Sequence, residues 1–155
     1  AHLFSYAGAP WLTQKWVRKV KAAYCDVTPY GGYRDDEDQG QMGALGVLMA
    51  IGLFEVDGGC AEKPFYEITS PLFDKVTIHL DNRYYSGKTF QIITKRNSTD
   101  NMYIQNASLN EKKWNKCWFY HEDFIKGGTL ELKLGAKPNK KWGVEELPPS
   151  FISSK

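Results

Sequence analysis

The alternation of hydrophobic and polar positions divides the chain into a helical first third and a strand-rich remainder. Between residues 10 and 24, apolar side chains recur every three or four positions, which predicts an amphipathic helix starting at Pro10. Residues 42–52 are apolar on nearly every face, so they predict a second helix that is buried all round. Gly43 and Gly46 lower the helix propensity of this segment, and a close-packed neighbour would explain their presence.

After residue 62 the hydrophobic period changes from 3.6 to 2, which is typical of β-strands. The predicted strands are residues 65–68, 75–80, 89–94, 102–109, 117–120 and 129–134. One helical turn is expected over residues 121–126. The chain is thus predicted to be α+β, in three parts: a helix pair (1–57), an all-antiparallel β unit forming a small sandwich or half of one (63–135), and an irregular tail (136–155).

Two helices joined by a loop cannot close a hydrophobic core alone, so we expect this pair to be the last of a larger helical assembly. The 155 residues, 42% of them hydrophobic, suffice for one domain or two small ones. The net charge of +2, with mixed signs, gives no indication of a nucleic-acid partner or a membrane surface. No apolar run is long enough for a membrane span. Three distant cysteines show no metal or redox spacing, and their odd number argues against a disulfide framework.

Four consecutive acidic residues, Asp35 to Asp38, stand directly before the second helix. The helix dipole favours negative charge at this position. In extended backbone, Asp36 and Asp38 would point to the same side, roughly 6.5–7 Å apart. Ionised carboxylates suit a general base, a water-positioning group or a ligand for a hard cation, but not a general acid. The structural alternative is that Asp38 caps the helix and the other acids are solvated.

Other residues are weaker candidates for a functional site. Trp11 could line a sugar site from the start of the first helix, or it could belong to the core. His121, followed by Glu122 and Asp123, could form a metal or acid–base cluster, but its position before a strand favours a capping turn. His79 is expected at the surface or an interface. Four aromatic residues favour sheet core over a glycan platform: Trp114, Trp118, Phe119 and Tyr120.

Seven sequence blocks resemble the C-terminal part of bacterial glycoside hydrolase family 92. They are YAGAPWLTQ (6–14), DDEDQGQM (35–42), ITSPLFDKVTIHL (68–80), GKTFQI (87–92), YIQNASLN (103–110), HEDFIKGGTLELKLG (121–135) and KPNKKWG (137–143). The blocks follow the family's order and extend over nearly the whole chain. Two segments depart from the family: residues 43–45 are Gly-Ala-Leu instead of Ser-Ala-Trp, and residues 30–34 are unlike the usual form. Both departures bear on sugar contacts and linkage preference.

The resemblance implies a calcium-dependent, inverting, exo-acting α-mannosidase, of the α-1,2 type, that removes terminal mannose from glycans. It implies an (α/α)6 barrel preceded by a β-sandwich domain, so this chain would supply the last barrel helices and a small antiparallel β-sandwich-like unit. The family's paired aspartates fall on Asp36 and Asp38, which would activate water as general bases. The general-acid glutamate and an Asn-Glu-Pro motif would lie upstream. The calcium ligands would lie mostly outside this chain, and none is assigned within it.

The implied partners are mannose-containing glycans and the rest of the parent enzyme, namely its upstream barrel and N-terminal β-sandwich. The implied location is periplasmic, cell-surface or secreted. The chain begins without a signal peptide or an initiator methionine, so we expect it to be a fragment that is inactive alone. A second function class stays open, in which the chain is a non-catalytic β module that binds glycans or packs between domains. The acidic pair separates the two classes, because a binding module has no need of two ionised aspartates at a helix start.

Overall fold

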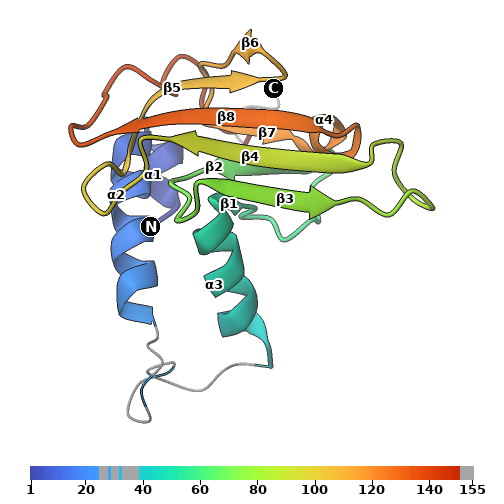
Figure 1. The fold of residues 1–155 in the computed structure, drawn as a ribbon, viewed down its shortest axis with the longest axis horizontal. Coiled ribbons are helices and arrows are strands. Elements are labelled where there is room, and N and C mark those ends of the chain that lie inside the picture. Colours follow the sequence, from blue (N-terminus) through green and yellow to red (C-terminus); the bar gives the residue numbers. More distant parts are fainter. Residues whose placement is uncertain (25–27, 29–31, 33–38, 151–155) are drawn as a thin grey trace.

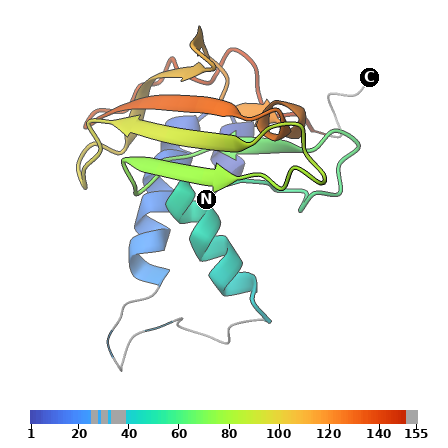
Figure 2. The ribbon, with the colours of Figure 1, turned by 45° about the vertical axis from the view of Figure 1, so that its right-hand side comes forward.

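The computed structural model describes residues 1–24, 28, 32 and 39–150. The described part has two β-sheets, with a pair of helices extending from one side of them (Figures 1 and 2). The helices are α1 (Leu3–Tyr6), α2 (Pro10–Tyr24), α3 (Gln41–Ile51) and α4 (His121–Ile125). The three-stranded sheet has the order β1 (Leu53–Phe54), β2 (Phe65–Ile68), β7 (Trp118–Tyr120). The five-stranded sheet has the order β3 (Lys75–His79), β4 (Thr89–Lys95), β8 (Gly128–Gly135), β5 (Tyr103–Leu109), β6 (Lys112–Lys113).

The long helices and the main strands agree with the sequence prediction to within about one residue at each end. The α+β class with two sheets and few helices is therefore confirmed. Three short elements, α1, β1 and β6, were not predicted because each is too short to show a hydrophobic period.

The prediction of an all-antiparallel β unit is wrong at one strand pair. β4 and β8 run parallel, with Phe90 opposite Gly128. β8 lies between β4 and β5, and it is parallel to β4 but antiparallel to β5. A parallel pair needs a long connection, which here includes β5, β6, β7 and α4. Hydrophobic alternation identifies strands but not their partners, so the sequence pattern could not show this pairing.

The hydrophobic core lies between the two sheets. Alternate residues of β4 and β8 are buried, among them Ile92 and Leu130. Phe90 of β4 stacks on Phe119 of β7, with their ring centroids 5.6 Å apart, so this contact joins the five-stranded sheet to the three-stranded sheet. Trp118 and Phe119 are buried, which confirms that they are core residues.

The helix pair buries only one side of itself within this chain. Met49 and Ala50 of α3 are buried, whereas Val47 is 60% exposed. The prediction that this helix is buried all round is therefore wrong for the chain as it stands. Large apolar side chains are also exposed on α1 and α2, namely Leu3, Phe4, Trp16 and Val20. Apolar patches of this kind mark interaction surfaces.

Gly87 offers a test of how tightly the ends of β4 and β8 are packed. A Cβ atom at this position would clash with the backbone nitrogen of Gly127, and backbone cannot move aside as a flexible side chain can. We expect Gly87→Ala to lower the free energy of unfolding in urea by about 1–3 kcal/mol.

The matched control is Gly135→Ala, whose Cβ would meet the flexible side chain of Gln105 at 3.0 Å. This variant should lose less stability than Gly87→Ala. Equal losses of stability in the two variants would show that the close approach of the Gly127 backbone does not determine the effect of a methyl group at Gly87.

Candidate functional site

The predicted catalytic pair, Asp36 and Asp38, lies outside the described residues. The structure does describe the chain directly after Asp38, where Gln39 and Gly40 both have left-handed backbone, with φ of 59° and 97°. Gly40 is the N-cap of α3, so the structural alternative in which Asp38 caps this helix is wrong. Glycine suits the cap because its φ is one that side chains disfavour.

The start of α3 is an electropositive position that its own first turn does not neutralise. The first turn of α3 contains no acidic residue. The partial positive charge of the helix dipole at a helix start attracts negative charge. The acidic residues 35–38 precede this position in sequence. The described backbone is therefore compatible with ionised carboxylates near the helix start.

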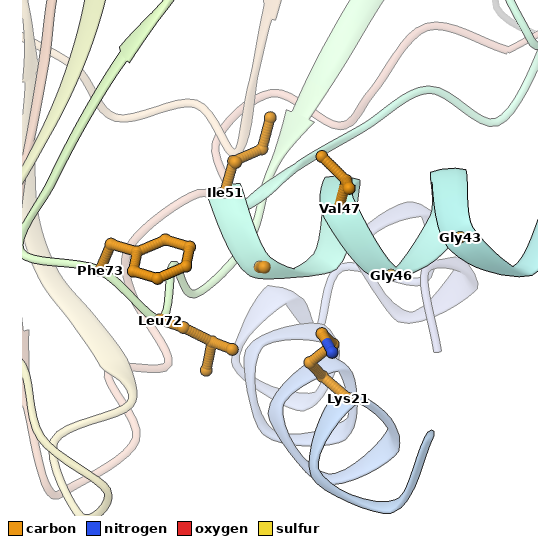
Figure 3. Close-up of a pocket in the computed structure, with 8 residues that line it drawn as sticks. Lys21, Gly43, Gly46, Val47, Ile51, Leu72 and Phe73 are labelled. Carbon is orange, nitrogen blue, oxygen red and sulfur yellow. The ribbon is translucent and has the colours of Figure 1, made fainter. Parts of the chain in front are cut away.

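A groove of about 360 Å³ runs between α2, α3 and the loop of residues 69–74 (Figure 3). Gly43 and Gly46 of α3 line this groove together with Lys21 of α2 (Figure 3). Leu72 and Phe73 form the wall on the loop side. The lining is apolar except for Lys21, which suits packing rather than chemistry.

Arg18 of α2 fixes this loop to the helix. Its Nε donates to the backbone oxygen and the Oγ of Ser70, both at 3.0 Å. Its Nη2 donates to the backbone oxygen of Pro71 and, at 2.6 Å, to Oδ1 of Asn97. Burial lowers the pKa of Arg18 below its usual value. The guanidinium therefore joins α2 to two loops through neutral acceptors.

The same loop is also bound to α3. The backbone nitrogen of Leu72 donates to the oxygen of Ala50 at 2.9 Å, and that of Thr69 donates to the oxygen of Gly52 at 2.8 Å. At its far end, Thr94 of β4 donates through Oγ1 to the oxygen of Phe73 at 2.7 Å. Residues 69–74 thus connect both long helices to the five-stranded sheet.

Trp11 is half-buried at the end of α2 nearest the sheets, while α3 starts at the opposite end of the helix pair (Figure 1). A helix of 15 residues is roughly 22 Å long, so the structure does not bring Trp11 to the start of α3. The Nζ of Lys140 lies 5.9 Å from the Trp11 ring centroid.

The histidines make structural contacts or none. The Nδ1 of His121 hydrogen bonds the Tyr66 hydroxyl at 3.0 Å, within a group of aromatic rings. His79 is exposed, which confirms its surface position. Among the described residues, no group of three or more His, Cys, Asp or Glu side chains could hold a metal ion. None of the helices in the described part of the chain is long and apolar enough to cross a bilayer.

Sequence reasoning missed one buried polar group, Glu67 of β2. Its side chain is fully buried, and its Oε2 lies 3.2 Å from Nδ1 of His2. The available signal was an acidic residue inside an apolar strand, between Phe65 and Ile68. This site lies at the junction of α1 with the three-stranded sheet.

Comparison with known proteins gives consistent matches. The model of the glycosyl hydrolase family 92 catalytic domain matches residues 1–136. An uncharacterized secreted glycosidase of Arthroderma benhamiae is 35% identical in an alignment of 154 residues that covers 96% of this chain and 19% of the relative. The chain thus spans about a fifth of that protein.

Solved structures give the same result. A family GH92 α-mannosidase from Bacteroides thetaiotaomicron superimposes with a TM-score of 0.85 at 30% identity, over 96% of this chain and 19% of that one. A family GH92 inverting mannosidase from the same species gives a TM-score of 0.81 at 34% identity, over 97% of this chain and 20% of that one. The two sheets and the helix pair are therefore an arrangement shared with part of larger enzymes.

Arg18→Lys tests the connection between α2 and the loop of residues 69–74. Lysine keeps the charge but cannot place donors as a guanidinium does, so buried acceptors would lose their partners. We expect the free energy of unfolding to fall by about 1–3 kcal/mol, measured by urea denaturation. Lys19→Ala, on the exposed side of the same helix, should change it by less than about 0.5 kcal/mol. A loss as small as the control's would show that the Arg18 contacts do not hold the loop.

Proposed function

Because the chain belongs to glycosyl hydrolase family 92, we propose that its parent protein is an exo-acting α-mannosidase that removes terminal mannose from glycans. The observation that carries this proposal is the family match over residues 1–136, which includes the acidic segment before α3. Two structural relatives that share 30% and 34% identity with the chain are described as mannosidases, one of them as inverting. Since the chain covers about a fifth of these enzymes, the activity is proposed for the parent protein rather than for the chain alone.

We assign Asp36 and Asp38 the role of general base on an inverting pathway. In such a mechanism one carboxylic acid protonates the leaving sugar, while a carboxylate about 6.5–9.5 Å away activates water on the opposite face. The positive end of α3 supports this role, because it favours carboxylates that stay ionised. The general acid would come from the upstream part of the parent protein.

The substrate details follow from the family resemblance. The proposed linkage is α-1,2, and the departure at residues 43–45 is the place where this chain would differ in sugar contacts. A contact between Trp11 and the sugar is retained as a proposal, although the structure places this residue at the sheet end of α2. Calcium dependence is proposed from the resemblance alone, and no step of the hydrolysis is assigned to the ion.

The exposed apolar side of the helix pair supports the proposal that other parts of the parent protein pack against it. Leu3, Trp16, Val20 and Val47 would be covered there by other helices of an (α/α)6 barrel. The N-terminal β-sandwich would complete the catalytic domain. Export from the cell is proposed because the relative from Arthroderma benhamiae is described as secreted.

Substitutions in the acidic segment of the intact parent protein test the catalytic assignment. Asp38→Asn keeps the shape but removes the base, so turnover of an α-mannoside should fall by about 10²–10⁴-fold. Asp36→Asn should be milder if Asp36 only positions water, and equally severe if both aspartates share the proton.

The matched controls are Asp35→Asn and Glu37→Gln, which alternate to the other side of an extended chain. Both should retain most of the turnover. If they lose as much as the Asp36 and Asp38 variants, the segment acts through folding and the assignment of the base is wrong.

The chain of 155 residues alone should not hydrolyse α-mannosides. It would carry the base without an opposed general acid, and about four-fifths of a family enzyme's length is absent. Sugar release from an α-mannoside by the purified chain, followed by chromatography, would contradict the proposed division of the active site.

A further inference from the structure

Glu67 occupies an unusual position for a carboxylate. It lies in β2, the middle strand of the three-stranded sheet, and its side chain is 0% exposed. Within the described part of the chain, no lysine or arginine forms an ion pair with it. The ion-pair partner that the structure gives it is His2, through Nδ1 and Oε2 at 3.2 Å. Compensation of a buried carboxylate charge therefore depends on this imidazole.

The other carboxylate oxygen is not satisfied. Oε1 of Glu67 is buried and makes no hydrogen bond with any described residue. The Tyr6 hydroxyl lies beside the carboxylate and helps to lower its pKa, but it makes no well-formed hydrogen bond to Oε1. Burial has the larger effect and raises the pKa of Glu67 above its usual value, while His2 opposes this shift. An ionised Glu67 is thus costly to keep in place.

His2 connects this carboxylate to the helices. It is the N-cap of α1, and its ring stacks on Phe54 of β1 with ring centroids 3.7 Å apart. Ser5, at the centre of α1, is buried and hydrogen bonds Thr13 of α2 through their hydroxyls at 2.9 Å. α1 is thus held to the sheet through His2 and to α2 through Ser5.

We propose that the buried His2–Glu67 pair holds α1 against the three-stranded sheet. We further propose that α1 separates from β2 when the pair loses its proton. With one proton, the pair is either imidazolium and carboxylate or imidazole and carboxylic acid, and its total charge is zero. Loss of that proton to solvent leaves a buried negative charge beside a neutral ring.

The other titratable groups around Glu67 do not replace this proton with a positive charge. Tyr6 has a raised pKa, because of burial and then the charge of Glu67. Burial, followed by the charge of Glu67, raises the pKa of the Cys117 thiol to about 12. Both groups therefore stay neutral near pH 7.

The sign of the pH dependence follows from the raised pKa of Glu67. The folded state binds this proton more tightly than the unfolded chain does, so the associated stability is fully present below the ordinary Glu pKa of 4.5. It is lost as pH rises through the raised value. The contact between α1 and β2 should therefore weaken with increasing pH.

Cys117 provides a reporter for the separation of α1. Its side chain is buried at 0% exposure, and a hydrogen bond from Ser5 of α1 acts on its thiol. Cys60 is exposed and serves as a reference within the same molecule. The ratio of the two labelling rates removes the part of the pH dependence that the two thiols share, because maleimide reacts with the thiolate of each.

The experiment labels the purified chain with N-ethylmaleimide from about pH 5.5 to about pH 8.5, a range above the ordinary Glu pKa of 4.5. Peptide mass spectrometry gives the labelling rate of Cys117 relative to Cys60. We expect this ratio to rise about tenfold over the range in the unsubstituted chain. In Glu67→Gln, which carries no buried charge, the ratio should stay nearly constant.

His2→Gln should give a ratio about tenfold higher than the unsubstituted chain at the acidic end of the range. His79→Gln, which removes an exposed histidine of β3, should behave as the unsubstituted chain does. Tryptophan fluorescence at each pH would show whether the whole chain unfolds.

A pH-independent ratio in the unsubstituted chain would overturn the proposal, even if the variants failed to fold. So would a rise that persists in Glu67→Gln, or one matched by unfolding of the whole chain. None of these outcomes depends on mannosidase activity, so the proposal is tested independently of the proposed function.

Discussion

The arrangement of helices and sheets depends on the guanidinium of Arg18. From one half-buried side chain it donates to Ser70, to Pro71 and to Asn97, which belong to two different loops. One of these loops also bonds to the C-terminal end of α3 and to β4. The five donors of a guanidinium lie in a fixed plane, so the acceptors must hold matching positions. Without that match, the groove between α2 and α3 would lose the wall formed by Leu72 and Phe73.

This junction is polar, whereas the space between the sheets is apolar. Gln14 of α2 is buried, and its Oε1 accepts a hydrogen bond from the backbone nitrogen of Ile104 in β5 at 2.9 Å. Trp16 and Val20, on the same helix, are exposed. Val17 of α2 is fully buried, so the apolar side chains of this helix are only partly covered within this chain. Partial cover is expected where further helices of a parent protein complete the packing.

Local signals explain which parts of the fold could be predicted. Pro10 and the three–four spacing defined α2, and alternation defined β2 and β4, because these patterns involve neighbours in sequence. The parallel pairing of β4 with β8 depends on residues far apart in the chain, so no local pattern contained it. The acidic residue inside β2 was a local signal for Glu67, but its partner His2 is 65 positions away, so no local pattern contained the pair. The roles of Asp36 and Asp38 stay predictions, because they lie outside the described residues.

The central place of β8 has a consequence for biosynthesis. β8 is the last strand of the described residues, yet it separates β4 from β5 in the five-stranded sheet. A ribosome therefore releases β4 and β5 before it has synthesised β8. Until β8 is added, each of these two strands has an edge without its partner strand. Unpaired edges are sites of aggregation, so this interval is when a chaperone would be of most use. A stop codon shortly before Gly128 would leave two halves of a sheet without their common neighbour, rather than a slightly shorter protein.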